Sequence, residues 1–288
     1  MKKNLFAILP VFLFLSCKED TTPSWLEIPS IDLETNEVIE GSDSQGITDA
    51  WVYMDGTPIG AFELPCKIPI LAEGEHSFLI YAGIKNNGIN KTRTRYPFYE
   101  RFETTLTLVK GQITTVSPIV NYKTNLVFEL KEDFENVGIA LIPEIISDTP
   151  IVFIEKSMYP EIVKYGNKCG AVFLTTMDSL FKASTQSDYD LPKGEEVYLE
   201  IDFMNSNSMV TGVIAKTSSS YIEHTPYVIM PAQDPATMVW KKIYIELTED
   251  VSWETLATSY EFYLLSILDS DKTSGVIYLD NIKLIHYQ

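Results

Sequence analysis

The chain has 288 residues, of which 45% are hydrophobic and 12% aromatic, so it is long enough to bury one large or two medium cores. It is strongly acidic, with 40 Asp and Glu against 22 Lys and Arg and a formal net charge of −18. This charge argues against nucleic acid as a partner, because phosphate backbones are bound by clustered Lys and Arg, and against adsorption to anionic headgroups.

The first predicted element is an N-terminal signal peptide. Two lysines precede an apolar run from Leu5 to Leu15. The run has the length of a signal-peptide core and is too short to cross a bilayer, which needs about 20 residues. The small residue Ser16 then precedes Cys17. We therefore predict a signal peptide over residues 1–16.

The segment Leu-Phe-Leu-Ser-Cys, ending at Cys17, resembles the lipobox of bacterial lipoproteins. The resemblance implies lipidation of Cys17 and a stable anchor of several acyl chains. The next residues, Lys18, Glu19 and Asp20, resemble the export signal of Bacteroidota lipoproteins, which implies a lipid-anchored protein on the outer face of the outer membrane. The alternatives are an ordinary secretory signal, a charged linker and residence on the inner leaflet.

A polar tether is predicted over residues 17–46, with a first strand around Trp25 to Ile28 as an option. From residue 47 the pattern turns to short strands. Asp55-Gly56 between two apolar runs predicts a hairpin, because a type I′ turn needs positive φ at its central residues. Six or seven such strands without a helical period predict a β-sandwich over residues 47–122.

Two stretches of this domain resemble a known class of module. They are Val52 to Gly60 and Pro69 to His76, which are similar to the PEGA-type and other Ig-like modules of bacterial envelope proteins. Gly83 to Tyr99 is similar to a stretch of uncharacterised Bacteroidota lipoproteins. The resemblance implies an Ig-like fold and no particular function.

The second predicted domain covers residues 123–288 and consists of further short strands. Val197 to Phe203 alternates apolar and polar residues, which predicts one face in the core and one in solvent. Only Ser252 to Ser259 has the character of a helical turn.

The order of these strands resembles a jelly roll of the galactose-binding or carbohydrate-binding-module type. The segments that carry the resemblance are Asp133 to Glu135, Gly194 to Phe203, Trp240 to Leu247 and Val276 to Leu284. It implies a last strand beside the first. The predicted fold class is therefore all-β, with an Ig-like and then a jelly-roll β-sandwich after a lipidated N-terminal tether.

The jelly-roll resemblance also implies a structural calcium site. Asp280 occupies the position of a calcium ligand, with Asp133 and Glu135 as its partners. Calcium takes six to eight oxygen ligands, so backbone carbonyls would have to join these carboxylates. The alternative is that Asp280 and Asn281 form only a bulge or a turn. No other cofactor is predicted.

Exposed aromatic residues are the second kind of candidate site, because pyranose faces stack on aromatic rings. Trp240 opens a strand and is predicted to belong to the core. Tyr221, Tyr227 and Trp253 remain as candidate glycan-binding residues. The alternative for each is ordinary packing.

A basic and aromatic segment interrupts this acidic chain. Its candidate contact residues are Arg93, Arg95, Tyr96, Tyr99 and Arg101. Arg and Tyr are enriched at interface hot spots, so we predict a loop that docks on a protein partner. The alternative is a hairpin extension that covers a sheet edge.

No catalytic residue is predicted. The three histidines, His76, His224 and His286, share no metal-binding spacing, and no nucleophile or phosphate-loop motif is present. A glycosidase needs only two suitably spaced carboxylates, which 40 acidic residues leave open.

The sequence thus predicts a non-enzymatic lipoprotein of the outer-membrane surface. Its predicted role is that of an accessory subunit of an outer-membrane complex for uptake, secretion or protein assembly, docked on a β-barrel through the Arg/Tyr loop. The alternative function is glycan binding by the jelly roll.

Overall fold

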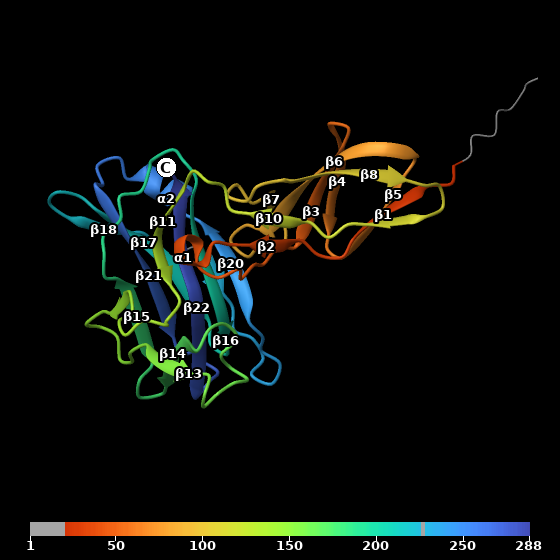
Figure 1. Ribbon diagram of the computed structural model, residues 1–288. Helices are drawn as coiled ribbons and strands as arrows, with labels where there is room; N and C mark the ends of the chain where they lie inside the picture. The colour runs from red at the N-terminus through yellow and green to blue at the C-terminus, as the bar shows by residue number, and fades with distance from the viewer. Residues whose placement is uncertain (1–20, 226–227) are drawn as a thin grey trace, which may run out of the picture.

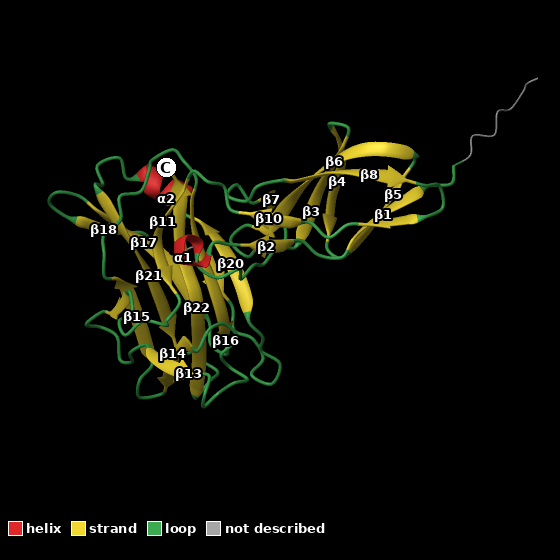
Figure 2. Ribbon diagram, viewed as in Figure 1, coloured by secondary structure: helices red, strands yellow, loops and turns green. Residues whose placement is uncertain are grey.

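The protein folds into two β-sandwich domains in the computed structural model, which describes residues 21–225 and 228–288 (Figure 1). Strands dominate, and helices are limited to two short segments among the described residues (Figure 2). Neither helix is long and apolar enough to cross a membrane. The predicted signal peptide, Cys17 and the export signal Lys18, Glu19 and Asp20 lie outside the described residues.

The first domain packs two sheets face to face. One has the strand order β5-β1-β9, and the other has the order β4-β3-β6-β7 with β8 also paired to β6. A short parallel pair, β2 and β10, flanks them. The elements are β1 (Ser24–Ile28), β2 (Asp32–Glu34), α1 (Glu37–Glu40), β3 (Asp49–Met54), β4 (Thr57–Glu63), β5 (Cys66–Ile70), β6 (Gly74–Lys85), β7 (Arg93–Arg95), β8 (Phe102–Leu108), β9 (Ile113–Thr115) and β10 (Ile119–Asn121).

The folded part begins earlier than the sequence predicts. Strand β1 pairs with β5 on one side and β9 on the other. Its side chains Leu26 and Ile28 are fully buried in the core of the first domain. The predicted tether of residues 17–46 is therefore too long, because the strand foreseen as an option at Trp25 to Ile28 is a central strand. The domain starts at Ser24 and not at residue 47.

The predicted hairpin is confirmed. Strand β3 ends at Met54 and β4 begins at Thr57, and the two strands pair antiparallel. Asp55 and Gly56 both have positive φ, at 49° and 78°, as a type I′ turn requires. Local turn chemistry therefore decides this connection.

The second domain is a larger two-sheet sandwich whose successive strands mostly alternate between the sheets, in the manner of a jelly roll. One sheet has the order β13-β14-β22-β16-β20 with β11 paired to β22, and the other has the order β12-β15-β21-β17-β18 with β19 paired to β17. The elements are β11 (Leu126–Glu132), β12 (Leu141–Pro143), β13 (Val152–Glu155), β14 (Lys168–Thr175), β15 (Leu180–Thr185), β16 (Val197–Asn205), β17 (Met209–Lys216), β18 (Tyr221–Glu223), β19 (Val228–Met230), β20 (Lys241–Glu246), α2 (Thr248–Trp253), β21 (Ser259–Ile267) and β22 (Ser274–Tyr287).

The last strand lies beside the first of this domain, as the resemblance implies. Strand β22 pairs antiparallel with β11 along its second half and with β14 along its first half. The predicted helical turn at Ser252 to Ser259 is displaced, since α2 begins at Thr248 and ends at Trp253.

The prediction of a solvent face on Val197 to Phe203 is wrong. All nine residues of β16 are buried. The odd-numbered side chains enter the core of the second domain, whereas Tyr198 and Glu200 contact the first domain. Asp202 is buried on the same face beside Asn281 and Lys242. The alternation is real, but the polar face is covered by the neighbouring domain instead of water.

Candidate ligand-binding site

Trp253 ends helix α2 and is the most exposed of the predicted aromatic candidates that the structure describes, with 80% of its surface accessible. The helix is fixed by Val251, which is fully buried and whose carbonyl accepts a 2.7 Å hydrogen bond from Tyr260. Trp253 follows the buried Val251 by two positions, which corresponds to about 200° of rotation around the helix axis. Its side chain therefore points away from the core. The helix therefore holds a large apolar ring in solvent.

His224 lies beside this helix, although it comes from the segment after β18. Its Nδ1 atom is 3.2 Å from Oδ1 of Asp250, and its Nε2 atom is 3.4 Å from Oε1 of Glu254. Its backbone is held on both sides, because its N–H donates to the Val213 carbonyl and its carbonyl accepts from the Tyr263 hydroxyl. The ring thus has a fixed place between two carboxylates of the α2 region.

Together these residues enclose a cleft of about 450 Å³, called here the Trp253 cleft and lined by Ile222, His224, Glu249, Asp250, Trp253 and Glu254. Two polar atoms in it, His224 Nε2 and Asp250 Oδ2, are buried without a hydrogen-bond partner among the described residues. The Nε2 atom is close to Glu254 but is not aligned for a hydrogen bond. Unsatisfied buried polar atoms are rare in folded proteins and point to a missing partner.

The cleft continues toward the first domain. Glu249 and Asp250 also line a neighbouring hollow together with Asn87 and Glu246. Asn87 reaches this position because its N–H donates to the Tyr244 carbonyl and its Oδ1 accepts from the Glu246 N–H. An elongated ligand on Trp253 therefore has a polar path to the domain junction.

The other aromatic candidates have different places. Tyr221, on β18, is 72% exposed but does not line the Trp253 cleft. Tyr227 lies outside the described residues. Trp240 is half-buried, and its indole N–H donates a 2.7 Å hydrogen bond to the Ile162 carbonyl. Sequence reasoning found Trp253 but missed the carboxylates of Asp250 and Glu254, which no local pattern singles out.

The predicted partner-docking loop is corrected by the structure. Tyr96 and Tyr99 are 3% exposed and pack edge to face against each other at the junction with the second domain. Arg93 forms ion pairs with Asp49 and Glu63, and the other two arginines also contact residues of the first domain: Arg95 over Tyr81 and Arg101 with Glu103. The loop does dock, but on the chain's own second domain, where its aromatic rings complete a core.

A buried charge cluster forms the centre of this junction. Glu200 is fully buried and accepts hydrogen bonds from the hydroxyls of Tyr96, at 2.7 Å, and Tyr122, at 2.9 Å. Lys242 lies 3.0 Å from it and Lys283 is nearby. Although burial acts to raise it, the pKa of Glu200 is lowered, because these two lysines stabilise the carboxylate.

The three residues of the predicted calcium site lie near enough for their charges to interact, but they do not form a set of metal ligands. Oδ1 of Asp280 accepts from the Asn281 N–H, Oδ1 of Asp133 accepts from the Glu135 N–H, and Glu135 accepts from the backbone of Asn167. Across 21–225 and 228–288, no group of three or more His, Cys, Asp or Glu residues is placed to hold a metal ion. The carboxylate of Asp133 instead caps a local turn, and that of Glu135 holds the backbone of Asn167 and Lys168.

Asp280 gives the stability of the fold a pH dependence. Burial, together with the nearby carboxylates of Asp202, Asp133 and Glu135, raises its pKa from 3.8 to about 8. The folded state therefore keeps a proton that the unfolded state loses above pH 4, so this contribution to stability is complete below pH 4 and is lost as the pH rises to about 8.

We expect Asp280→Asn to remove this dependence. Between pH 5 and pH 7.5 the variant should gain up to about 3 kcal/mol in unfolding free energy relative to the wild type, since one proton corresponds to about 1.4 kcal/mol per pH unit. Urea unfolding at the two pH values measures the difference. A difference between variant and wild type that does not change with pH would contradict the assignment.

No protein-family model matches the chain, and no curated protein matches it. Solved structures similar to it include β-sandwich carbohydrate-binding modules and the enzymatically active domain of a bacteriophage tailspike protein. One, described as from the β-sandwich superfamily, covers 84% of this chain and 87% of its own, with 15% identity and a TM-score of 0.36. A tandem of two family 22 modules from Paenibacillus barcinonensis covers 86% and 75%, with 10% identity and a TM-score of 0.39. A family 11 module from Clostridium thermocellum covers 55% and 93%, with 18% identity and a TM-score of 0.36.

At these identities and TM-scores, the likenesses carry no argument about what this chain binds. The strand order of the chain itself defines an all-β protein with two β-sandwich domains, of which the second is arranged as a jelly roll. The Ig-like assignment of the first domain stays a prediction.

Proposed function

We propose that this protein is a non-enzymatic glycan-binding protein and that the Trp253 cleft holds the ligand. The observation that carries the proposal is the combination of an indole that is 80% exposed with the partly exposed carboxylates of Asp250 and Glu254 in the same cleft. A pyranose ring stacks its apolar face on an indole, and its hydroxyls satisfy carboxylate and imidazole groups.

The charge of the cleft favours neutral sugars. Glu249, Asp250 and Glu254 supply carboxylates, and no lysine or arginine is among the described residues that line it. Carboxylate oxygens accept hydrogen bonds from hydroxyl groups, whereas a second negative charge would be repelled. The ligand is therefore a neutral saccharide with vicinal hydroxyls.

An array of neutral and acidic oligosaccharides, probed with the full chain, tests this function. Retention on neutral members is the expected result. Failure to retain any neutral saccharide would overturn the proposal.

The protein acts, in this proposal, from the outer face of the outer membrane, with Cys17 as the lipidated anchor. The support is the sequence from Leu13 to Asp20, which combines a lipobox-like segment with acidic residues. Protease shaving of intact cells tests the location, because surface domains are cleaved and periplasmic domains are protected.

An accessory role in an outer-membrane complex keeps one supporting observation. Ile142 on β12 and Ile267 on β21 belong to the same sheet and are 46% and 61% exposed. Exposed apolar side chains are common at protein interfaces. Co-purification of a β-barrel from detergent extracts, lost when Ile142 and Ile267 are replaced by Ser, would favour this second function.

A further inference from the structure

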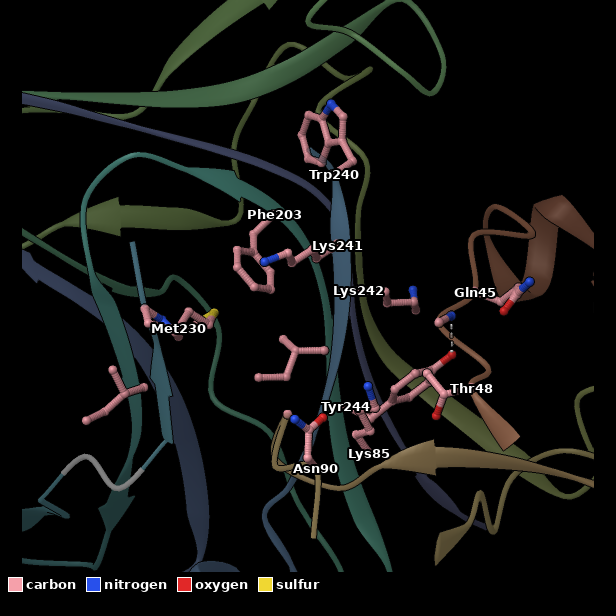
Figure 3. Close-up of a pocket in the computed structure, with 15 residues that line it drawn as sticks. Gln45, Thr48, Lys85, Asn90, Phe203, Met230, Trp240, Lys241, Lys242 and Tyr244 are labelled. Carbon is pink, nitrogen blue, oxygen red and sulfur yellow. Dashed lines mark hydrogen bonds between the residues drawn. The ribbon is translucent and has the colours of Figure 1, made fainter. Parts of the chain in front are cut away.

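A second cleft, of about 460 Å³, lies at the junction of the two domains along strand β20 (Figure 3). The second domain contributes Phe203 and Trp240 to its wall, and the first domain contributes Thr48 and Asn90. Ligand sites commonly have volumes of about 300–1,000 Å³ and lie at domain interfaces. We call this region the junction cleft.

The side chains that line the junction cleft carry a net positive charge, although the whole chain is acidic. Lys85 and Lys241 both line it, and none of its lining residues is Asp or Glu. Most lysines of the described ranges contact a carboxylate, another oxygen atom or an aromatic ring. Within those ranges Lys85, Lys91 and Lys241 make no such contact. Two of these three lysines therefore face one cavity.

The remaining lining groups suit a saccharide. Trp240 is held in a fixed position by its hydrogen bond to the Ile162 carbonyl, so its ring is ordered before any ligand binds. Asn90, Gln45 and Thr48 supply amide and hydroxyl groups around the opening (Figure 3). The cleft thus combines an aromatic wall, neutral polar groups and two unpaired cations.

The same surroundings disfavour a peptide that would add a strand to β20. A Cβ at Gly46 would lie 3.3 Å from the Lys242 carbonyl oxygen, so the chain of the first domain already covers the strand edge there. Farther along, Asn86 bridges to Tyr244 and closes the next part of the edge. Strand addition needs a free row of N–H and C=O groups, and this row is occupied.

We propose that the junction cleft binds saccharides that carry a carboxylate or sulfate group, with Lys85 and Lys241 contacting the anion. This inference rests on the proposed glycan-binding function and adds a second site of opposite charge to the neutral-sugar site at Trp253. The loop of residues 86–92 separates the two, because Asn87 lines the acidic hollow and Asn90 lines the junction cleft.

The test is calorimetric titration of the full chain with three probes: tetragalacturonate, a chondroitin sulfate tetrasaccharide and a neutral galactose tetramer. Replacing Lys85 and Lys241 together by Gln should weaken binding of at least one acidic probe tenfold or more and leave the neutral probe unchanged. Increasing salt should weaken the acidic probe in the wild type, because the interaction is screened. Lys91→Gln is the matched control, since it removes a neighbouring unpaired charge that does not line the cleft.

Several results would overturn the inference: no binding of either acidic probe, equal weakening by Lys91→Gln, or full binding by the double variant. Neither lysine has an internal partner, so the melting temperature of the double variant should match that of the wild type. Trp253→Ala separates the two proposals. If no neutral saccharide of the array binds while an acidic probe binds in a lysine-dependent way, the Trp253 proposal fails and the junction cleft stands.

Discussion

Trp253→Ala is expected to reduce the affinity for neutral oligosaccharides about 30-fold or more while leaving the fold intact. Truncating an aromatic anchor at the centre of a binding site costs about 2 kcal/mol or more. The ring is 80% exposed, so its removal takes little away from the core. Calorimetric titration measures the affinity, and thermal unfolding should show an unchanged melting temperature.

Tyr221→Ala is the matched control for this experiment. Tyr221 is 72% exposed on the neighbouring strand β18 but does not line the cleft. Its removal should leave the affinity unchanged. Equal losses from the two variants would show that exposed aromatic surface in general, and not the Trp253 cleft, is responsible.

Glu200→Gln is expected to lower the free energy of unfolding by about 3–5 kcal/mol. The substitution keeps the size of the side chain and removes its charge, which takes the nearest carboxylate away from the buried Lys242 and Lys283. Lys242 then keeps only the longer contact of 3.6 Å to Asp202 among its ion pairs in the described residues. Breaking a buried ion pair by removing one partner has a cost of this size. Urea unfolding measures the change, and the transition should remain single because the two domains share this cluster.

Two further variants show whether the lost charge of Glu200 causes the drop in unfolding free energy. Adding Lys242→Met to Glu200→Gln should restore part of the loss, because the uncompensated ammonium group is removed. Glu103→Gln, at the exposed ion pair with Arg101, should cost less than about 1 kcal/mol. A Glu200→Gln protein as stable as the wild type would refute the view that this cluster holds the domains together.

Local chemistry explains the part of the fold that could be predicted. The turn at Asp55-Gly56 follows from two residues that accept positive φ, and the alternation of β16 is visible in the sequence. The alternation of apolar and polar residues along a strand does not show whether water or another domain covers the polar face. The sequence alone predicts solvent on the side of Tyr198 and Glu200, because the residues that cover these two side chains come from the other domain.

The candidate site shows the same limit. Trp253 could be singled out from the sequence as a candidate aromatic residue, but its partner His224 lies 29 positions earlier in the chain. Only the pairing of β17 with β21 and the burial of Val251 bring the two segments together. Tyr96 and Tyr99 were predicted to contact a partner protein, but they are buried between the two domains of the chain. The sequence cannot separate the two cases, because an interface within one chain has the same residue types as an interface between chains.

The position of strand β1 has a mechanical consequence. The described chain enters at the end of the first domain that lies farthest from the second (Figure 1). The junction between the domains is fixed by buried side chains, including the hydrogen bond from Tyr96 to Glu200. If Cys17 is lipidated as proposed, the first domain is a stiff stalk that holds both clefts at a set height above the bilayer.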